Sequence, residues 1–392
     1  MEMDDTKTTE NKAMRSNNGG EPPSPRLCAK CKEQVGVYTL RRNNSYCRDC
    51  LEEYLSQKVR GALCKRGGLI GGEKVGLCFS GGMSSLCATY LIEAHSRIPS
   101  GERRQRKKVP FDMTVFHVDL LGESLYQDAR VERIMEQDPP WCQEIEIVKA
   151  EDVLFQEQKA PSEHIKNLID SISDSTGRED LKMILIRETM LEKAMKEGWS
   201  YILMANTADA RAREAVAATA KGQGFALSSF SCAIDSRYGE GRPRVVYCMK
   251  DVTQEEVDCL SSALLGENVV QQQGDAVVAD KKNIHNLADI FTKQLQMSNP
   301  GGVSNIMSSV AKLTEFDWET DNPACCPLCW APMHEDEMLG ALASETPLAI
   351  VCESCKVGVF GCLTNEELAK SEHASQIFNK LPDVIRNRIL NK

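Results

Sequence analysis

The segment with the most specific chemistry is Ser80-Gly81-Gly82-Met83-Ser84-Ser85. An apolar run of strand formers leads into it from Val75, and residues with helical spacing follow it. A glycine turn between a strand and a helix lets the backbone approach a ligand closely, and the amides at the helix start face an anion. Serine hydroxyls add further donors. The segment therefore predicts a phosphate-binding loop, with an ordinary strand-to-helix turn as the alternative.

Eight of the seventeen cysteines form four C-x2-C pairs. Fifteen residues separate the first two pairs and twenty-two separate the last two. Paired knuckles at such spacing supply four thiolates to one tetrahedral metal ion. We interpret them as two structural zinc sites, with iron-sulfur clusters as the alternative and Cys325 as a competitor of Cys326. The expected ligands are Cys28, Cys31, Cys47 and Cys50 in the first site, and Cys326, Cys329, Cys352 and Cys355 in the second.

The composition is that of a globular protein that is not uniformly basic. The 392 residues carry a formal net charge of -10 and are 42% hydrophobic, which suits several domains with a buried core. No apolar run approaches the roughly 18 residues that cross a bilayer, and residues 1–25 lack the apolar core of a signal peptide. We expect a disordered tail over 1–25 and a soluble, cytoplasmic protein without a membrane partner. Cysteines there stay reduced, which favours metal binding over disulfides.

Strand-forming runs alternate with helical patterns through the middle of the chain. The helical segments Leu181–Lys196 and Asp251–Leu265 each carry an apolar face. Such alternation predicts an α/β fold with a parallel sheet that is covered on both faces. The predicted strands are 75–79, 113–118, 145–148, 199–204 and 244–249. The predicted units are a zinc module at 26–60, an α/β domain at 70–260, a linker and helical segment at 261–320, a second zinc module at 321–365 and a helix at 366–392. Leu381-Pro382 is expected to kink or divide this last helix.

Polar residues follow two of these strands. His117 and Asp119 end the second strand, and Asn206, Thr207 and Asp209 follow the fourth. Ligands in open parallel sheets sit beyond the carboxyl ends of the strands, so these side chains are expected to join the serine-glycine loop in one cleft. His117 and Asp119 are candidates for adenine or ribose contacts, with a structural role as the alternative.

A basic run lies between the first two predicted strands. Its position in a loop leaves two interpretations, contact with nucleic acid or a solvated surface. The candidate residues are Arg103, Arg104, Arg106, Lys107 and Lys108.

The loop from Ser80 to Ser85 resembles the SGGxDS loop of the PP-loop ATP pyrophosphatases, which have an adenine nucleotide alpha hydrolase-like fold and grip the pyrophosphate end of ATP. Ser84 stands where that family has aspartate, so a carboxylate that could help hold magnesium is missing. With zinc-ribbon modules on both sides of this loop, the chain is similar to the tRNA 2-thiolation enzymes from about Cys28 to Cys355. Those enzymes activate the O2 of a uridine by adenylation and replace the oxygen by sulfur.

Within that group the chain most resembles the cytoplasmic tRNA 2-thiolation protein 2 family, the partner subunit of a heterodimer. Catalytic members have a C-x2-C ahead of the helix that begins here near Leu181, yet 176–182 contains no cysteine. They also have a GHNxDD sequence where this chain has Ala205-Asn206-Thr207-Ala208-Asp209. The segment Asn299–Leu313 resembles the one that precedes the partner subunit's second zinc module.

The resemblance implies a subunit that takes part in 2-thiolation of wobble uridine 34 in the tRNAs for Lys, Glu and Gln. It implies a catalytic PP-loop paralogue and tRNA as partners, and a thiocarboxylated ubiquitin-related modifier as sulfur carrier. It also implies zinc in both modules, and ATP bound here or only through the partner. Without a cysteine pair beside the cleft, the chain is not expected to catalyse thiolation alone. The alternatives are a self-sufficient ATP-dependent tRNA sulfurtransferase and a zinc-built interaction scaffold that binds neither nucleotide nor tRNA.

Overall fold

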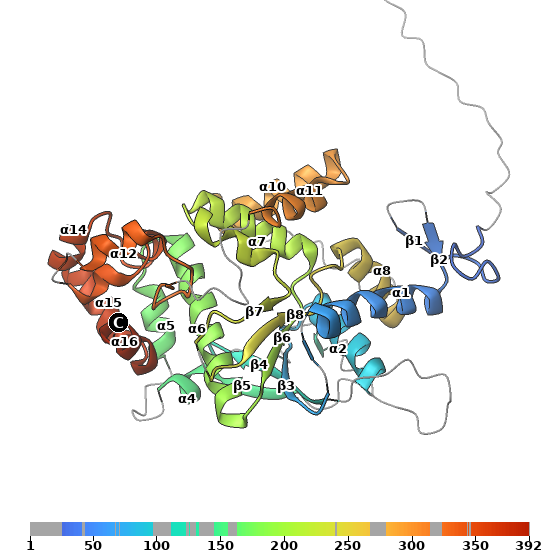
Figure 1. The fold of residues 1–392 in the computed structure, drawn as a ribbon, viewed down its shortest axis with the longest axis horizontal. Helices are drawn as coiled ribbons and strands as arrows, with labels where there is room; N and C mark the ends of the chain where they lie inside the picture. The colour runs from blue at the N-terminus through green and yellow to red at the C-terminus, as the bar shows by residue number, and fades with distance from the viewer. Residues whose placement is uncertain are drawn as a thin grey trace, which may run out of the picture.

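The structure is a computed structural model of the chain (Figure 1). It describes residues 26–391 except 41–43, 67, 70, 97–110, 123–124, 126–130, 133–144, 156–162, 240, 267–279, 314–323, 343 and 345. The predicted tail at 1–25 and the basic run with Arg103, Arg104, Arg106, Lys107 and Lys108 lie outside the described residues.

The centre of the fold is a six-stranded sheet with the strand order β5-β4-β3-β6-β8-β7. Its first five strands in this order are parallel, and β7 pairs with β8 in the antiparallel direction. The five predicted strands are confirmed, whereas the two-residue strand β7 was not predicted. The strands are β3 (Lys74–Cys78), β4 (Asp112–Asp119), β5 (Glu146–Lys149), β6 (Tyr201–Met204), β7 (Ile234–Asp235) and β8 (Arg244–Tyr247).

Successive strand residues pack into two separate apolar cores. In β6, Ile202 belongs to one core and Leu203 to the other, and in β8 Val245 and Val246 divide in the same way. Both faces of the sheet are therefore buried, as a parallel sheet requires. One core contains α1 (Arg48–Arg60), α2 (Met83–Ser96) and α8 (Gln254–Leu265), and the other contains α4 (Ala150–Leu154), α5 (His164–Asp170) and α6 (Ser175–Glu197).

The sheet extends from β3 in both directions, with β4 and β5 on one side and β6, β8 and β7 on the other. The chain leaves β3 toward β4 through α2, and it returns from β5 to β6 through α6 on the opposite face of the sheet. Such a switch point opens a crevice at the carboxyl ends of the two strands. The loop after β3 and the loop after β6 lie at this edge.

Local signals explain where the main helices begin and end. The Asp174 carboxylate accepts the Gly177 N–H at 2.6 Å and caps α6, which stops at Gly198 with φ 69°. Thr253 and Glu256 form a capping box at the start of α8, as the acidic first turn predicts. The helix α7 (Ala208–Ala220), which follows β6, was not predicted.

The two segments predicted as zinc modules lie at opposite ends of the molecule's longest axis (Figure 1). The first holds the hairpin of β1 (Tyr38–Leu40) and β2 (Asn44–Tyr46) and continues into α1. Lys58 of α1 donates to the Glu256 carboxylate at 2.6 Å, so this unit is anchored to α8. The second unit contains the 3-10 turn η5 (Pro347–Ile350) with α12 (Glu335–Leu342) and α13 (Glu353–Gly358).

The helical segment predicted at 366–392 has the predicted boundary at Leu381-Pro382 and a further break at Ser371, which was not predicted. Three short helices occupy this region, because Ser371 caps a new helix and Pro382 interrupts the next one. They are α14 (Asn365–Lys370), α15 (Glu372–Lys380) and α16 (Asp383–Leu390).

Two further helices, α10 (Ile284–Ser298) and α11 (Gly302–Val310), pack on α7 and fill the predicted helical segment (Figure 1). A π-helical turn η1 (Gly61–Arg66) follows α1, and a 3-10 turn η3 (Gly224–Phe230) follows α7. Within the described residues, no helix combines the length and the apolar character that crossing a membrane demands.

Candidate functional site

The first four predicted metal ligands meet at one point. The ligand atoms of Cys28, Cys31, Cys47 and Cys50 all lie within 4.8 Å of one another, and three of the four residues are buried. The β1–β2 hairpin brings the two pairs together, since it joins the first knuckle to the start of α1. Cys47 is the residue immediately before α1 and Cys50 lies in its first turn. The four cysteines predicted as ligands therefore lie together and could hold one metal ion.

The second set, Cys326, Cys329, Cys352 and Cys355, gathers in the same way within 4.8 Å. Cys352 directly precedes α13, and its N–H donates to the Cys326 sulfur at 3.3 Å. Cys325 does not belong to this group, and its backbone forms a bridge with Pro332. Between the two candidates, the structure brings the sulfur of Cys326 to the other three.

The two knuckles have the same backbone geometry. Lys32 and Trp330, each the residue after the second cysteine, have positive φ values of 61° and 62°. Each donates its N–H to the carbonyl of the first cysteine at 2.9 Å, from Lys32 to Cys28 and from Trp330 to Cys326. A left-handed residue is unusual outside glycine, so its recurrence marks a tight turn that aims two sulfurs at one point. Both modules are built for the same coordination.

The sulfur spacing fits a single ion. A tetrahedron with metal–sulfur bonds of about 2.3 Å has edges of about 3.8 Å. The Cys31 and Cys47 sulfurs are 3.9 Å apart, and the Cys329 and Cys352 sulfurs are 3.6 Å apart. A four-iron cluster would hold its thiolates farther apart, because each binds a different iron. The donor sets therefore suit one tetrahedral cation each.

The four thiols of the first quartet lie so close together that the ionisation of one opposes the ionisation of the others. Burial opposes the Cys28 thiolate, yet hydrogen bonds from the Cys47 and Cys31 backbone bring the pKa of Cys28 down to about 6. Burial and the neighbouring thiols raise the pKa of Cys50 to about 12. A divalent cation removes this conflict because it displaces protons from its thiol ligands.

A buried ionic cluster docks the second metal module on α6. Glu188, on the apolar face of α6, has no exposed surface. Its carboxylate accepts the Trp330 Nε1–H at 2.6 Å and two N–H groups of Arg388 at 2.9 and 2.8 Å. The Arg388 guanidinium also lies 4.2 Å from the Trp330 ring centroid. Glu188 was not predicted to have a role. The sequence signal for this cluster is an acidic residue within the apolar face of a helix.

The predicted phosphate loop has the expected order of strand, glycine turn and helix. Gly81 has φ 80°, and α2 begins at Met83. The Ser85 hydroxyl donates to the Gly82 carbonyl at 2.7 Å and closes the first turn. Gly81 itself is buried under two apolar side chains, whereas Ser80 is exposed and Gly82 and Ser84 are half-buried. An anion would therefore have to approach from the side of these three residues.

Replacing Gly81 by alanine should destabilise the protein by about 1–3 kcal/mol. The positive φ disfavours any side chain, and the new Cβ would lie 3.0 Å from Val131 Cγ2 and 3.2 Å from Leu125 Cδ1. Urea unfolding measures the change. Gly82→Ala is the matched control, since its Cβ would meet only the Ser80 hydroxyl at 3.5 Å, and we expect a change within about 0.5 kcal/mol. Equal effects of the two substitutions would contradict the assigned geometry.

The other predicted cleft residues already serve structural contacts. His117 Nδ1 lies 2.8 Å from the Phe79 carbonyl oxygen, and Asp119 accepts the Gly122 N–H at 2.7 Å. His117 thus contacts the residue that precedes the loop, whereas the contact with Gly122 ties Asp119 to the turn after β4. Nucleotide binding by Ser80, Gly81, Gly82, Ser84, Ser85, His117 and Asp119 stays a prediction.

The predicted residues after β6 form hydrogen bonds that support helices. Asn206 donates to Glu214 at 2.7 Å, and the Thr207 hydroxyl caps α7 by accepting the Ala210 N–H at 3.2 Å. Asp209 accepts the backbone N–H of Gln254 at 2.8 Å. The helix α7 owes its start to these contacts, which explains why this polar segment follows the strand.

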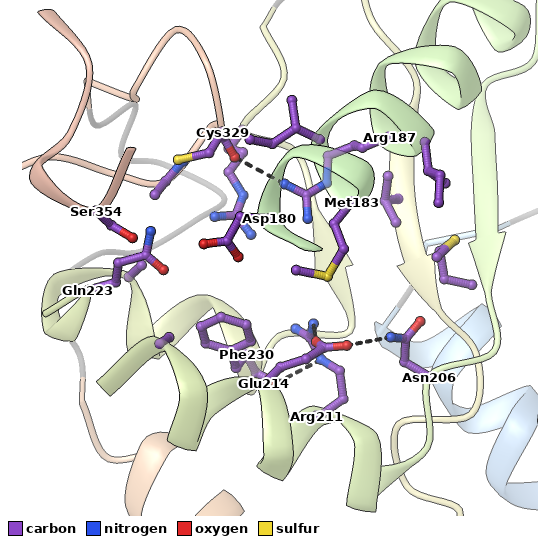
Figure 2. A pocket seen from close by; sticks show the side chains of 18 of the residues that line it. Asp180, Met183, Arg187, Asn206, Arg211, Glu214, Gln223, Phe230, Cys329 and Ser354 are labelled. Atoms are coloured by element: carbon purple, nitrogen blue, oxygen red, sulfur yellow. Dashed lines mark hydrogen bonds and ion pairs between the residues drawn. The ribbon is translucent and has the colours of Figure 1, made fainter. Parts of the chain in front are cut away.

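A cavity of about 310 Å³ that was not predicted lies between α6, α7 and the second metal module (Figure 2). Met204 and Tyr247 form its floor at the carboxyl ends of β6 and β8. Cys329 and Cys355 of the metal cluster line the opposite side. Of the residues predicted for the cleft, only Asn206 lines this cavity. The tertiary structure therefore places a second concave site beside the predicted loop.

Comparison with known proteins relates most of the chain to one group. It is 25% identical to cytoplasmic tRNA 2-thiolation protein 2 of Homo sapiens, over 82% of this chain and 76% of that protein. It is 27% identical to the protein of the same name from Oryza sativa subsp. indica, over 75% of this chain and 64% of that protein. The chain is similar to proteins named cytoplasmic tRNA 2-thiolation protein 2. No protein-family model matches it.

Among solved structures, the U34-tRNA thiolase NcsA from Methanococcus maripaludis, determined with its 4Fe-4S cluster, has a similar fold. The TM-score is 0.54 at 17% sequence identity, and the match covers 84% of this chain and 95% of that chain. The overall fold of this chain is thus similar to that of the solved protein. Within the described residues of this chain, the two cysteine quartets are the sole groups of three or more ligand-type side chains placed to hold a metal ion.

Proposed function

We propose that this chain is a cytoplasmic subunit of the machinery that 2-thiolates wobble uridine 34 in the tRNAs for Lys, Glu and Gln. It acts in a heterodimer with a catalytic PP-loop paralogue, which receives sulfur from a thiocarboxylated ubiquitin-related modifier. The observation that carries this proposal is the match to the 2-thiolation protein 2 relatives across about four fifths of the chain, 82% for the human protein. Zinc is the cation proposed for both cysteine quartets.

The thiols available in the described residues support a role without sulfur transfer. Exchange of oxygen for sulfur needs a nucleophilic sulfur, and the nucleophile is the thiolate. Burial raises the pKa of Cys78 and of Cys248 to about 12, so both are protonated at neutral pH. Burial also raises the pKa of Cys64, Cys87, Cys232 and Cys259 above the ordinary thiol value. Eight of the sixteen described cysteines belong to the two quartets. Sulfur delivery is therefore assigned to the partner.

The first turn of α6 supports the same division of labour. Catalytic relatives are expected to carry a cysteine pair ahead of this helix, but here Gly177 lies against the second metal module. A Cβ built on Gly177 would stand 1.7 Å from the Gly358 carbonyl oxygen. Backbone contact this close leaves no room for a side chain at Gly177. We therefore assign the first turn of α6 to packing on the second metal module of the same chain, and not to binding an iron-sulfur cluster.

The basic run is the proposed tRNA contact of this subunit. Reversing the charge of Arg103, Arg104 and Arg106 together should weaken tRNA binding and reduce the slope of log K against log salt by about 1 for each phosphate that the variant no longer neutralises. Filter binding at several salt concentrations measures both quantities. An unchanged slope would assign the run to solvent.

Co-purification from cells followed by quantification of 2-thiouridine tests the proposal as a whole. We expect a stable complex with the paralogue, and thiolation that requires both chains. Thiolation by the purified chain alone would favour a self-sufficient sulfurtransferase. A zinc-loaded chain that binds neither ATP nor tRNA, alone or in complex, would favour an interaction scaffold.

A further inference from the structure

The cavity between α6, α7 and the second metal module is lined by Arg187, which forms no ion pair with a described carboxylate; the carboxylate that influences its pKa is that of Asp235, which is already paired with Arg237. Arg187 of α6 points into the cavity and donates Nη1–H to the Cys329 carbonyl at 3.0 Å (Figure 2). Within the described residues, its Nε and Nη2 groups form no hydrogen bond. A half-buried guanidinium with donors left over is an anion-binding group.

The other cations around the cavity are already neutralised. Arg211 uses all three guanidinium nitrogens, on Glu214 at 2.9 Å and on two backbone carbonyls. Arg237 binds the Asp235 carboxylate at 2.6 Å, and Lys221 binds Asp180 at 2.6 Å. The contrast with these residues makes Arg187 the recognition group of the cavity.

The rest of the wall is suited to an apolar or aromatic body. Met183, Met190 and Met204 place thioethers around the space, and Phe230 adds an aromatic ring. Thioethers are polarizable and favour aromatic neighbours. The Gln223 amide and the Ser354 hydroxyl offer hydrogen bonds at the edge. A volume of about 310 Å³ is at the lower end of the range for ligand pockets, so the ligand is small.

We propose that this cavity binds a small organic anion, with a phosphate or carboxylate group on Arg187 and an apolar or aromatic body between the methionines and Phe230. The site is separate from the predicted phosphate loop, since none of residues 80–85 lines the cavity. The proposal does not depend on a role in tRNA thiolation. It makes the chain a receptor for a small molecule beside its second metal module.

Calorimetric titration of the full-length, metal-loaded chain tests the proposal. The probes are adenosine 5'-monophosphate, indole-3-acetate, adenosine and inorganic phosphate. We expect one or both organic anions to bind, with adenosine and inorganic phosphate at least about tenfold weaker because each lacks one half of the ligand. Binding of the nucleotide alone identifies a phosphate ester, and binding of the indole acid alone identifies a carboxylate.

Two variants locate the binding. Arg187→Met should weaken it about tenfold or more, and Met183→Trp should block the cavity while the guanidinium stays in place. Arg213→Met is the matched control, because Arg213 pairs with Asp289 at 3.1 Å outside the cavity. Metal content and circular dichroism establish that each variant is folded.

Three results would overturn the proposal. The first is the absence of binding by both organic anions. The second is nucleotide binding that persists in both cavity variants, which would place the nucleotide at the Ser80–Ser85 loop. The third is inorganic phosphate binding as tightly as the organic anions, which would reduce Arg187 to a nonspecific charge.

Discussion

Replacing Cys326 by serine should halve the metal content of the chain and unfold its second metal module. Zinc binding in small four-ligand modules is worth about 10–16 kcal/mol, and that energy is the folding energy of the module. Cys326 is fully buried, and the core around it includes Leu328, Val351 and Phe360. Losing the ion therefore exposes the apolar residues that join the module to α6. Elemental analysis and limited proteolysis measure the two effects.

Cys325→Ser is a control that differs by one position in the chain. Cys325 is also buried, but its sulfur is outside the quartet, so two ions per chain should remain. Loss of metal from the Cys325 variant alone would show that Cys325, and not Cys326, is the first ligand of the second quartet. Full metal content in both variants would refute the four-sulfur site.

The second large effect is expected from Glu188→Ala. Removing this carboxylate leaves Arg388 without its paired acceptor and Trp330 Nε1 without a hydrogen bond, in a site with no exposed surface for the acid. Breaking a buried ion pair from one side costs about 3–5 kcal/mol. Urea unfolding should show the loss, and proteolysis should show earlier release of α16. The metal content should not change, because no ligand is altered.

Glu192→Ala provides the comparison on the same helix, one turn further on. Glu192 accepts from Arg242 at 3.2 Å but is 25% exposed, so its loss should cost less than about 1 kcal/mol. Similar losses for the two variants would mean that the contact with Trp330 and Arg388 does not dock the module.

The elements that were predicted correctly are those with strong local patterns. The five parallel strands are continuous apolar runs, and α6 and α8 have periodic apolar faces with clear capping residues. The helix α7 was missed because its sequence, ADARAREAVAATA, spreads small and charged residues around the helix instead of forming an apolar stripe. Its partners, α10 and α11, are far away in sequence.

The chain's own sequence determined the metal centres and the class of fold. A C-x2-C knuckle acts over four residues, and a strand pattern over five or six, so both are encoded locally. Tertiary structure alone decided the cavity and the unpaired Arg187, because their surroundings come from α6, α7, η3 and the second metal module. Whether an arginine is neutralised depends on which carboxylates reach it through space. Spacing along the chain carries no information about that distance.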